Sequence, residues 1–404
     1  MNHPAHRRHR AGKGGALPMF MACAAAMAAL AGCAPSSRVN PPVAPTAAQP
    51  PALTAVDALV TETWRAMGGD FPMAVHVRDR QDRLVYARSL GGFDAAQPMP
   101  VASASKLVTG LLLLRLVDQG KLGLEDTTAQ QLGWSGDRGR ITLRQLLAQI
   151  SGLKPQAACV QDTRSTLQAC VDAIRDDPTA LAHAPGSHFD YGSTHFQVAA
   201  RMAEVATGRS WAQLFEAELA QPLALQPHTI YQTAPWFGRL RGEVGASANP
   251  QTAGGLVTSL ADYERLLALV FHRGEHSGHR RVRGTLFDDM ATVPNAAASV
   301  GSSPMARAAR QPYLYGLGVW AECVPARVAC PQISSAGAFG WTPWIDREAG
   351  YYAVIAMYRL PGGGLAATRG VVDASVQLQQ RLKPALAQAL RAVHGEKASI
   401  STQP

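Results

Sequence analysis

Lysine is scarce in this chain, with 6 lysines against 32 arginines, so each lysine is more informative than usual. The arginines are scattered, and no basic run is interleaved with aromatic residues, which argues against nucleic acid as a partner. No apolar run after position 30 reaches the roughly 20 residues that span a bilayer. Internal repeats are also absent from the sequence. The hydrophobic content of 47% is ordinary for a globular core, which excludes a disordered or fibrous chain.

The start of the chain predicts export. Positively charged residues between positions 7 and 13 precede an apolar run over 16–30, which is typical of a secretory signal peptide. The residues Leu30-Ala31-Gly32-Cys33 resemble a bacterial lipoprotein box, in which Cys33 becomes the acylated first residue. An ordinary cleavage site with an incidental cysteine is the alternative. Ala34, in place of the aspartate that often signals inner-membrane retention, favours the outer membrane.

A short tether is expected between this anchor and the folded part. Residues 33–52 are rich in proline and alanine and have too little apolar periodicity to fold. We therefore expect a protein that faces the periplasm and meets the membrane only through its N-terminal lipid. Loss of residues 1–32 removes four positive charges and no negative ones, which lowers the formal net charge from +9 to +5.

Four of the six cysteines form two close pairs, Cys159 with Cys170 and Cys323 with Cys330. In an exported protein each pair predicts a local disulfide that closes a loop. A metal site is the rival, but no histidine lies at ligand spacing from either pair. Three histidines do cluster between positions 272 and 279, in a turn rich in glycine and arginine, and we do not expect a metal there. No cofactor is expected.

The order of the expected elements predicts an α/β (α+β) fold. A helix over 53–67, a hairpin over 73–78 and 84–89 and a buried helix come first. Strands return at 314–320, 338–345 and 351–358, before a final helix over 371–393 that Pro384 should kink or split. We expect one domain over 53–395, with an α/β part near 53–117 and 313–395, a helical part near 118–312, and a tail over 396–404. The first and last thirds should share one antiparallel sheet.

Ser103 and Lys106 stand three residues apart at the start of the buried helix, which places them on one helix face. A lysine there can activate a serine hydroxyl for nucleophilic attack. The alternative is a serine that only caps the helix beside a solvated lysine. Ser151 and Lys154 have the same spacing, but Pro155 follows and disfavours the helix that would align them.

Several stretches together resemble the serine β-lactamase and DD-peptidase superfamily, closest to class C β-lactamases and family VIII carboxylesterases. The resemblance covers roughly Leu53 to Ala392. The matching stretches, in chain order, are Ser103-Ala-Ser-Lys106, Ile141-Thr-Leu-Arg-Gln-Leu-Leu147, Ile150-Ser-Gly-Leu153, Pro185-Gly186 before Tyr191-Gly192-Ser193, Ala253-Gly-Gly-Leu-Val-Thr-Ser-Leu-Ala-Asp262 and Tyr315-Gly-Leu-Gly318.

This resemblance implies a sandwich of antiparallel sheet and terminal helices, with an inserted helical region and the active site at the junction. It also implies acyl transfer, in which Ser103 forms a covalent acyl-enzyme. The oxyanion hole would use the backbone N–H groups of Ser103 and Ala338. Tyr191 would act as general base towards Ser103 and as acid towards the leaving group, with Lys106 as the nearby positive charge.

Two motifs depart from the family pattern. Ser193 replaces the usual asparagine two residues after the tyrosine, and Ser335-Ala336-Gly337 replaces the usual Lys-Thr-Gly or His-x-Gly. Ser193, Ser335 and Gly337 are the expected substrate-binding positions. The lost cation normally engages a substrate carboxylate, so its absence favours a small ester or amide without one. The alternatives are a β-lactamase or DD-peptidase that acts on β-lactams or cell-wall peptides, and a non-catalytic envelope protein that retains the fold for binding.

Overall fold

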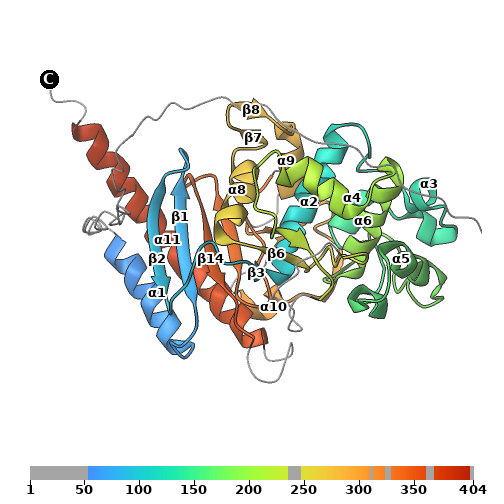
Figure 1. Ribbon diagram of the computed structural model, residues 1–404, viewed down its shortest axis with the longest axis horizontal. Coiled ribbons are helices and arrows are strands. Elements are labelled where there is room, and N and C mark those ends of the chain that lie inside the picture. Colours follow the sequence, from blue (N-terminus) through green and yellow to red (C-terminus); the bar gives the residue numbers. More distant parts are fainter. Residues whose placement is uncertain (1–52, 235–246, 310–312, 324–328, 361–367, 401–404) are drawn as a thin grey trace, which may run out of the picture. The chain divides into compact units, whose positions relative to one another are not determined.

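The computed structural model describes residues 53–234, 247–309, 313–323, 329–360 and 368–400 (Figure 1). The predicted signal peptide, the lipid site Cys33 and the tether lie outside the described residues, so they stay predictions. The described helices include none that combines the length and the apolar character needed to cross a bilayer.

An antiparallel sheet of seven strands organises the described part, in the order β10-β11-β12-β13-β14-β1-β2. Strands from the two ends of the chain are neighbours in it, because β1 pairs along its whole length with β14. The prediction that the first and last thirds share one sheet is therefore confirmed. The strands are β1 Met73–Asp79, β2 Leu84–Leu90, β10 Leu314–Tyr315, β11 Trp320–Ala321, β12 Gln332–Ser334, β13 Thr342–Asp346 and β14 Tyr351–Met357.

Both faces of this sheet are covered. All seven residues of β14 are buried, and they alternate between two apolar clusters, as the two-residue period of a strand requires. Helices α1 (Thr54–Ala66) and α11 (Arg369–Ile400) pack together on one face, and α8 (Leu260–Phe271) contacts β14 on the other (Figure 1). The mixed α/β fold class predicted from the sequence is thus the one observed.

The middle of the chain is mainly helical and contains short strands that the sequence did not predict. Helix α2 runs over Ser105–Asp118 and is buried on nearly all sides. The further helices are α3 Thr128–Leu132, α4 Leu143–Leu147, α5 Leu167–Asp176, α6 Thr194–Thr207, α7 Trp211–Phe215, α9 Gly284–Ala291 and α10 Met305–Ala308. Small sheets are built from β3 Met99–Pro100, β4 His188–Asp190, β5 Ile230–Tyr231, β6 Leu256–Thr258, β7 Glu275–His276, β8 His279–Arg280 and β9 Ser299–Ser302.

Three predictions near the C-terminus were wrong in extent. The stretch 314–320 is a hairpin of β10 and β11, because Gly318 has a φ of +85° and turns the chain. The strand predicted from Ala338 begins only at Thr342, after a turn in which the Gly337 N–H donates to the Trp341 carbonyl at 2.7 Å. Helix α11 runs without a break through Pro384 and continues to Ile400, into the segment expected to be a tail.

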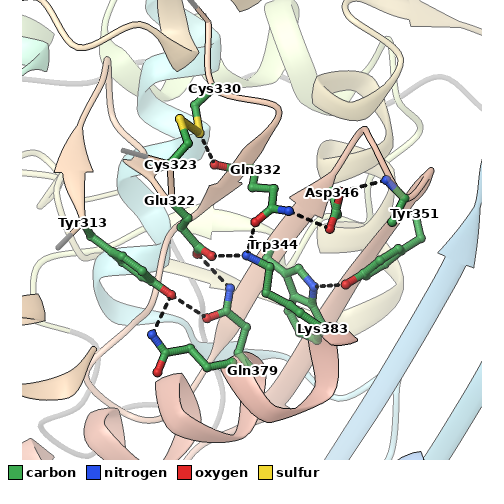
Figure 2. A network of polar contacts seen from close by, with 12 residues as sticks. Tyr313, Glu322, Cys323, Cys330, Gln332, Trp344, Asp346, Tyr351, Gln379 and Lys383 are labelled. Atoms are coloured by element: carbon green, nitrogen blue, oxygen red, sulfur yellow. Dashed lines mark hydrogen bonds and ion pairs between the residues drawn. A yellow bond between two sulfur atoms is a disulfide. The ribbon is translucent and has the colours of Figure 1, made fainter. Parts of the chain in front are cut away.

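Both predicted cysteine pairs form disulfides, Cys159–Cys170 and Cys323–Cys330. The second closes the connection between β11 and β12. Beside this disulfide, a polar network joins the β11–β12 segment to α11 (Figure 2). Lys383 of α11 lies 2.6 Å from both the Glu322 carboxylate and the Gln332 side-chain oxygen. The Glu322 side chain is 0% exposed and that of Lys383 12%, so this is a buried ion pair.

Removal of the lysine should destabilise the protein strongly. Lys383→Met leaves the Glu322 carboxylate buried without its cation, and we expect a loss of about 3–5 kcal/mol in the free energy of unfolding. Urea titration measures it. Arg381→Met on the same helix is the matched control, because its partner Glu62 is exposed and the pair is worth at most about 1 kcal/mol. Equal losses in the two variants would contradict this view of the network.

Candidate active site

The candidate nucleophile lies in a short turn that leads into α2. Residues Ala102–Ala104 form a 3₁₀ turn, and Ala102 adopts the left-handed region at φ 46°, which is unusual for alanine. Buried hydrogen bonds fix this turn: the Ser105 hydroxyl donates to the Ala102 carbonyl at 2.6 Å, and the Tyr263 hydroxyl donates to the Ala104 carbonyl at 2.9 Å. Strained backbone held by such contacts is common at functional sites. Ser103 itself remains partly exposed.

Lys106 meets Ser103 as the spacing predicts. Its Nζ lies 3.1 Å from the Ser103 hydroxyl oxygen and donates to the Ala253 carbonyl at 3.0 Å. The residue is 2% exposed, and Nζ lies 4.5 Å from the centre of the Tyr191 ring. Because burial disfavours the charged form, the pKa of Lys106 falls to about 7. A substantial fraction of neutral amine is therefore available at neutral pH to accept the serine proton.

The Tyr315-Gly-Leu-Gly318 stretch packs directly against the backbone of α2, which explains why it ends in glycine. A Cβ on Gly318 would lie 2.7 Å from the Lys106 carbonyl oxygen, and a Cβ on Gly110 of α2 would lie 2.8 Å from the Leu317 carbonyl oxygen. Only glycines let the β10–β11 turn press against the helix that carries Lys106. This contact places Trp320, the first residue of β11, beside the site.

Tyr191 follows β4 and packs its ring on Trp320, with the ring centres 5.0 Å apart and the planes 21° from parallel. Burial raises the pKa of Tyr191 well above its usual value, and a hydrogen bond with Ser103 opposes that rise only in part. The phenol therefore keeps its proton at neutral pH, which suits a proton donor to a leaving group. The pKa directions of the two groups favour Lys106 over Tyr191 as the base. That Tyr191 acts as the base, as the family resemblance implies, stays a prediction.

The Ser335-Ala336-Gly337 motif lies directly beside the nucleophile. The Ser335 hydroxyl donates to the Ser103 carbonyl at 3.3 Å. A Cβ on Gly337 would lie 2.1 Å from the Val101 carbonyl oxygen, so only glycine allows this approach. Ala338 follows in the tight turn before β13, next to the nucleophile's segment. Ser103 and Ala338 line the same cavity, and the role of their N–H groups as oxyanion donors stays a prediction.

A cavity of about 430 Å³ opens at Ser103 and Tyr191. The predicted substrate-binding residues Ser193, Ser335 and Gly337 are all buried, and none of them is among the described residues that line it. The role of these three in binding stays a prediction. The rest of the lining consists of Ser302, Ser303, Pro304, Met305, Arg307, Ala336, Ala338, Thr368, Arg369 and Val372.

The two arginines in this lining were not predicted from the sequence. Arg307 of α10 pairs with Asp373 at 2.7 Å, and one of its nitrogens donates to the Arg369 carbonyl. Arg369 begins α11 and has no ion-pair partner among the described residues. Lys106 is thus not the only cation near Ser103. No sequence signal marked these positions, because arginine is common in this chain and both lie outside the matched motifs.

The second Ser-x-x-Lys pattern does not assemble. Ser151 is buried and hydrogen-bonds to His195 at 2.7 Å, whereas Lys154 is exposed and bonds to the Thr179 hydroxyl. Of the clustered histidines, His272 pairs with Asp82 at 2.7 Å, and His276 lies opposite His279 in the β7–β8 hairpin. The described residues contain no group of three possible metal ligands.

Comparison with known proteins agrees with this site. Residues 17–378 match the model of the Beta-lactamase family. A crystal structure of a candidate beta-lactamase from Bacteroides dorei DSM 17855 is 28% identical, with a TM-score of 0.66 over 78% of this chain and 97% of that one. Protein flp of Staphylococcus aureus (strain MW2) is 29% identical over 33% of this chain and 28% of its own length. Teichoic acid D-alanine hydrolase of Staphylococcus aureus is 30% identical over 34% of this chain.

The chain spans about a third or less of the length of these two curated relatives. The family match, in contrast, covers most of the chain and includes the stretches that carry Ser103, Lys106 and Tyr191. The chain therefore belongs to the Beta-lactamase family, a family of serine hydrolases.

Proposed function

We propose that this protein is an exported, lipid-anchored esterase or amidase that acts on a small acyl substrate through an acyl-enzyme on Ser103. The observation that carries the proposal is the 3.1 Å contact between the Lys106 amine and the Ser103 hydroxyl at the floor of an open cavity. The signal-like start of the sequence and Cys33 support the anchor. Incorporation of a labelled fatty acid that is lost in Cys33→Ala tests that part.

In the proposed reaction, the Ser103 oxygen attacks the carbonyl carbon of the substrate while neutral Lys106 takes the hydroxyl proton. The negative charge that develops on the carbonyl oxygen is met by the backbone N–H groups of Ser103 and Ala338. The bond to the leaving group then breaks, and the Tyr191 phenol donates a proton to that group. Water then attacks the acyl-enzyme and gives a proton to the Tyr191 phenolate, while protonated Lys106 returns a proton to the Ser103 oxygen, which releases the acid and restores the site.

The substrate class is inferred from the Ser335-Ala336-Gly337 motif and from a relative. Ser335 has no charge to offer a carboxylate, so an ester or amide without one suits that position. One relative is by name a hydrolase of teichoic acid D-alanine, which supports removal of a small acyl group from a larger carrier.

The pH dependence should identify the base. Lys106 accepts a proton only in its neutral form, and its pKa is about 7, so activity should be lost as the pH falls through that value. We expect kcat/KM for an uncharged aryl ester to rise about tenfold per unit below neutrality and to level off above it. Were the Tyr191 phenolate the base, the rise would occur only at strongly alkaline pH. A profile measured from about pH 5 to about pH 9 separates the two.

A second candidate is hydrolysis of a substrate with an anionic group, as in a β-lactam or a cell-wall peptide. Arg369 favours it, because this arginine lines the cavity and has no ion-pair partner among the described residues. Two esters that differ only in a carboxylate distinguish the candidates. If the carboxylate is bound, Arg369→Gln should raise KM about tenfold for that ester alone, which corresponds to about 1.4 kcal/mol.

The proposal as a whole is tested by covalent labelling. A fluorescent alkyl phosphonate should react once per folded molecule, and mass spectrometry should locate the adduct on Ser103. Turnover of a short-chain aryl ester should accompany it. A folded protein that neither labels nor turns over the ester would instead support the non-catalytic binding function.

A further inference from the structure

The backbone of Tyr191 is fixed by a buried cluster that the proposed reaction does not use. The cluster consists of Gln149 and Ser151, which follow α4, and of His195 in the first turn of α6. All three side chains are 0% exposed. The His195 ring lies 2.7 Å from the Ser151 hydroxyl through Nδ1 and 2.8 Å from the Asp190 carbonyl through Nε2.

These contacts determine the protonation of His195. A carbonyl oxygen only accepts, so Nε2 carries the hydrogen and donates to Asp190. Nδ1 is then the acceptor for the Ser151 hydroxyl, whose oxygen in turn accepts the Leu153 N–H at 3.2 Å. Burial lowers the pKa of His195 to about 4, the Asp190 bond opposes this, and the charge of Lys106 adds to it. The ring is therefore neutral, and both of its nitrogens are hydrogen-bonded, so His195 does not act as an acid or a base.

Three hydrogen bonds of this cluster hold the backbone on either side of Tyr191. His195 holds the Asp190 carbonyl, which belongs to the peptide bond joining Asp190 to Tyr191. Gln149 accepts the Asp190 N–H through its backbone at 3.1 Å and the Gly192 N–H through its side chain at 2.6 Å. Its backbone is in the left-handed region, at φ 57°, which is strained for a residue other than glycine.

We infer that His195 and Ser151, with Gln149, are positioning residues that hold the Tyr191 phenol in reach of Ser103, an inference that rests on the proposed function. The Tyr191 ring stacks on Trp320 and meets the Tyr315 ring at near right angles, with the centres 5.8 Å apart, and the backbone position sets how far its hydroxyl reaches past them. A displacement of about 1 Å in a reacting group can cost about 10²-fold in rate. Because His195 does not line the cavity, its loss should spare substrate binding.

Two substitutions at His195 test this. His195→Leu removes both hydrogen bonds, whereas His195→Gln can keep a donor for Asp190 and an acceptor for Ser151. We expect His195→Leu to lower kcat by about 10²-fold with KM unchanged and His195→Gln to recover most of that loss. Tyr86→Phe is the matched control. Tyr86 lies on β2, at the far edge of the sheet, and the substitution removes a hydroxyl that donates to Asp57 of α1, so the variant should keep the wild-type kcat.

A second measurement does not depend on turnover. In protein labelled with ¹³C at tyrosine Cζ, the resonance that is lost in Tyr191→Phe should move in His195→Leu and stay in place in His195→Gln. If His195→Leu does not fold, Ser151→Ala, which removes only the hydroxyl, should shift the same resonance and lower kcat. If the wild-type protein is inactive, the proposed function is refuted, and the Tyr191 resonance alone then decides this inference. An unmoved Tyr191 resonance, an unchanged kcat, or equal impairment of the glutamine and leucine variants would overturn it.

Discussion

Ser103→Ala should lower kcat for an aryl ester by about 10⁴-fold or more, because the covalent route is lost and only the oxyanion donors and binding remain. The substitution removes one partly exposed hydroxyl and leaves the buried bonds of Ser105 and Tyr263 in place, so the turn should keep its shape. Steady-state kinetics, with circular dichroism to confirm folding, give the measurement.

Ser105→Ala is the matched control for that experiment, since Ser105 lies two residues along the same segment. Its hydroxyl is buried and bonds to the Ala102 carbonyl, so the variant should be less stable but should still form the phosphonate adduct. An adduct that persists in Ser103→Ala, or ester turnover equal to wild type there, would show that another residue is the nucleophile.

Lys106→Met should be nearly as damaging, with a loss in kcat of about 10²–10⁴-fold, the range for a general base. Methionine keeps much of the side-chain volume in this buried position and removes the amine that lies 3.1 Å from the Ser103 oxygen. The arginines that line the cavity supply charge but cannot accept a proton at neutral pH, so they should not compensate.

Two further lysine variants separate charge from proton transfer. Lys106→Arg keeps a positive charge, but a guanidinium stays protonated at these pH values and cannot act as a base, so the variant should be as inactive as Lys106→Met. Lys154→Met, from the second Ser-x-x-Lys pattern, should keep the wild-type rate, because Lys154 is exposed and bonds to Thr179. Activity in Lys106→Arg would mean that the site needs a cation there rather than a base.

The nucleophile and its partner lysine were accessible from sequence because they depend on local geometry. Ser103 and Lys106 are three residues apart at the start of one helix, and that spacing alone brings their side chains together. The shared sheet was also predictable, since the stretches that form β1 and β14 are rich in apolar and β-forming residues, as buried strands are. The bounds of β11 and β13 were not, because turns at Gly318 and Gly337 depend on which backbone each glycine meets.

The sequence by itself determined the fold class, the Ser103–Lys106 pair and both cysteine pairings, because each rests on local period or spacing. Only the tertiary structure decided how the site is charged. Burial in the packed fold, which no single stretch encodes, brings the pKa of Lys106 to about 7 and keeps Tyr191 protonated. The same packing brings Arg369 to the cavity and His195 to the backbone of Tyr191, because these contacts join segments far apart in the chain or depend on turns that the sequence does not mark.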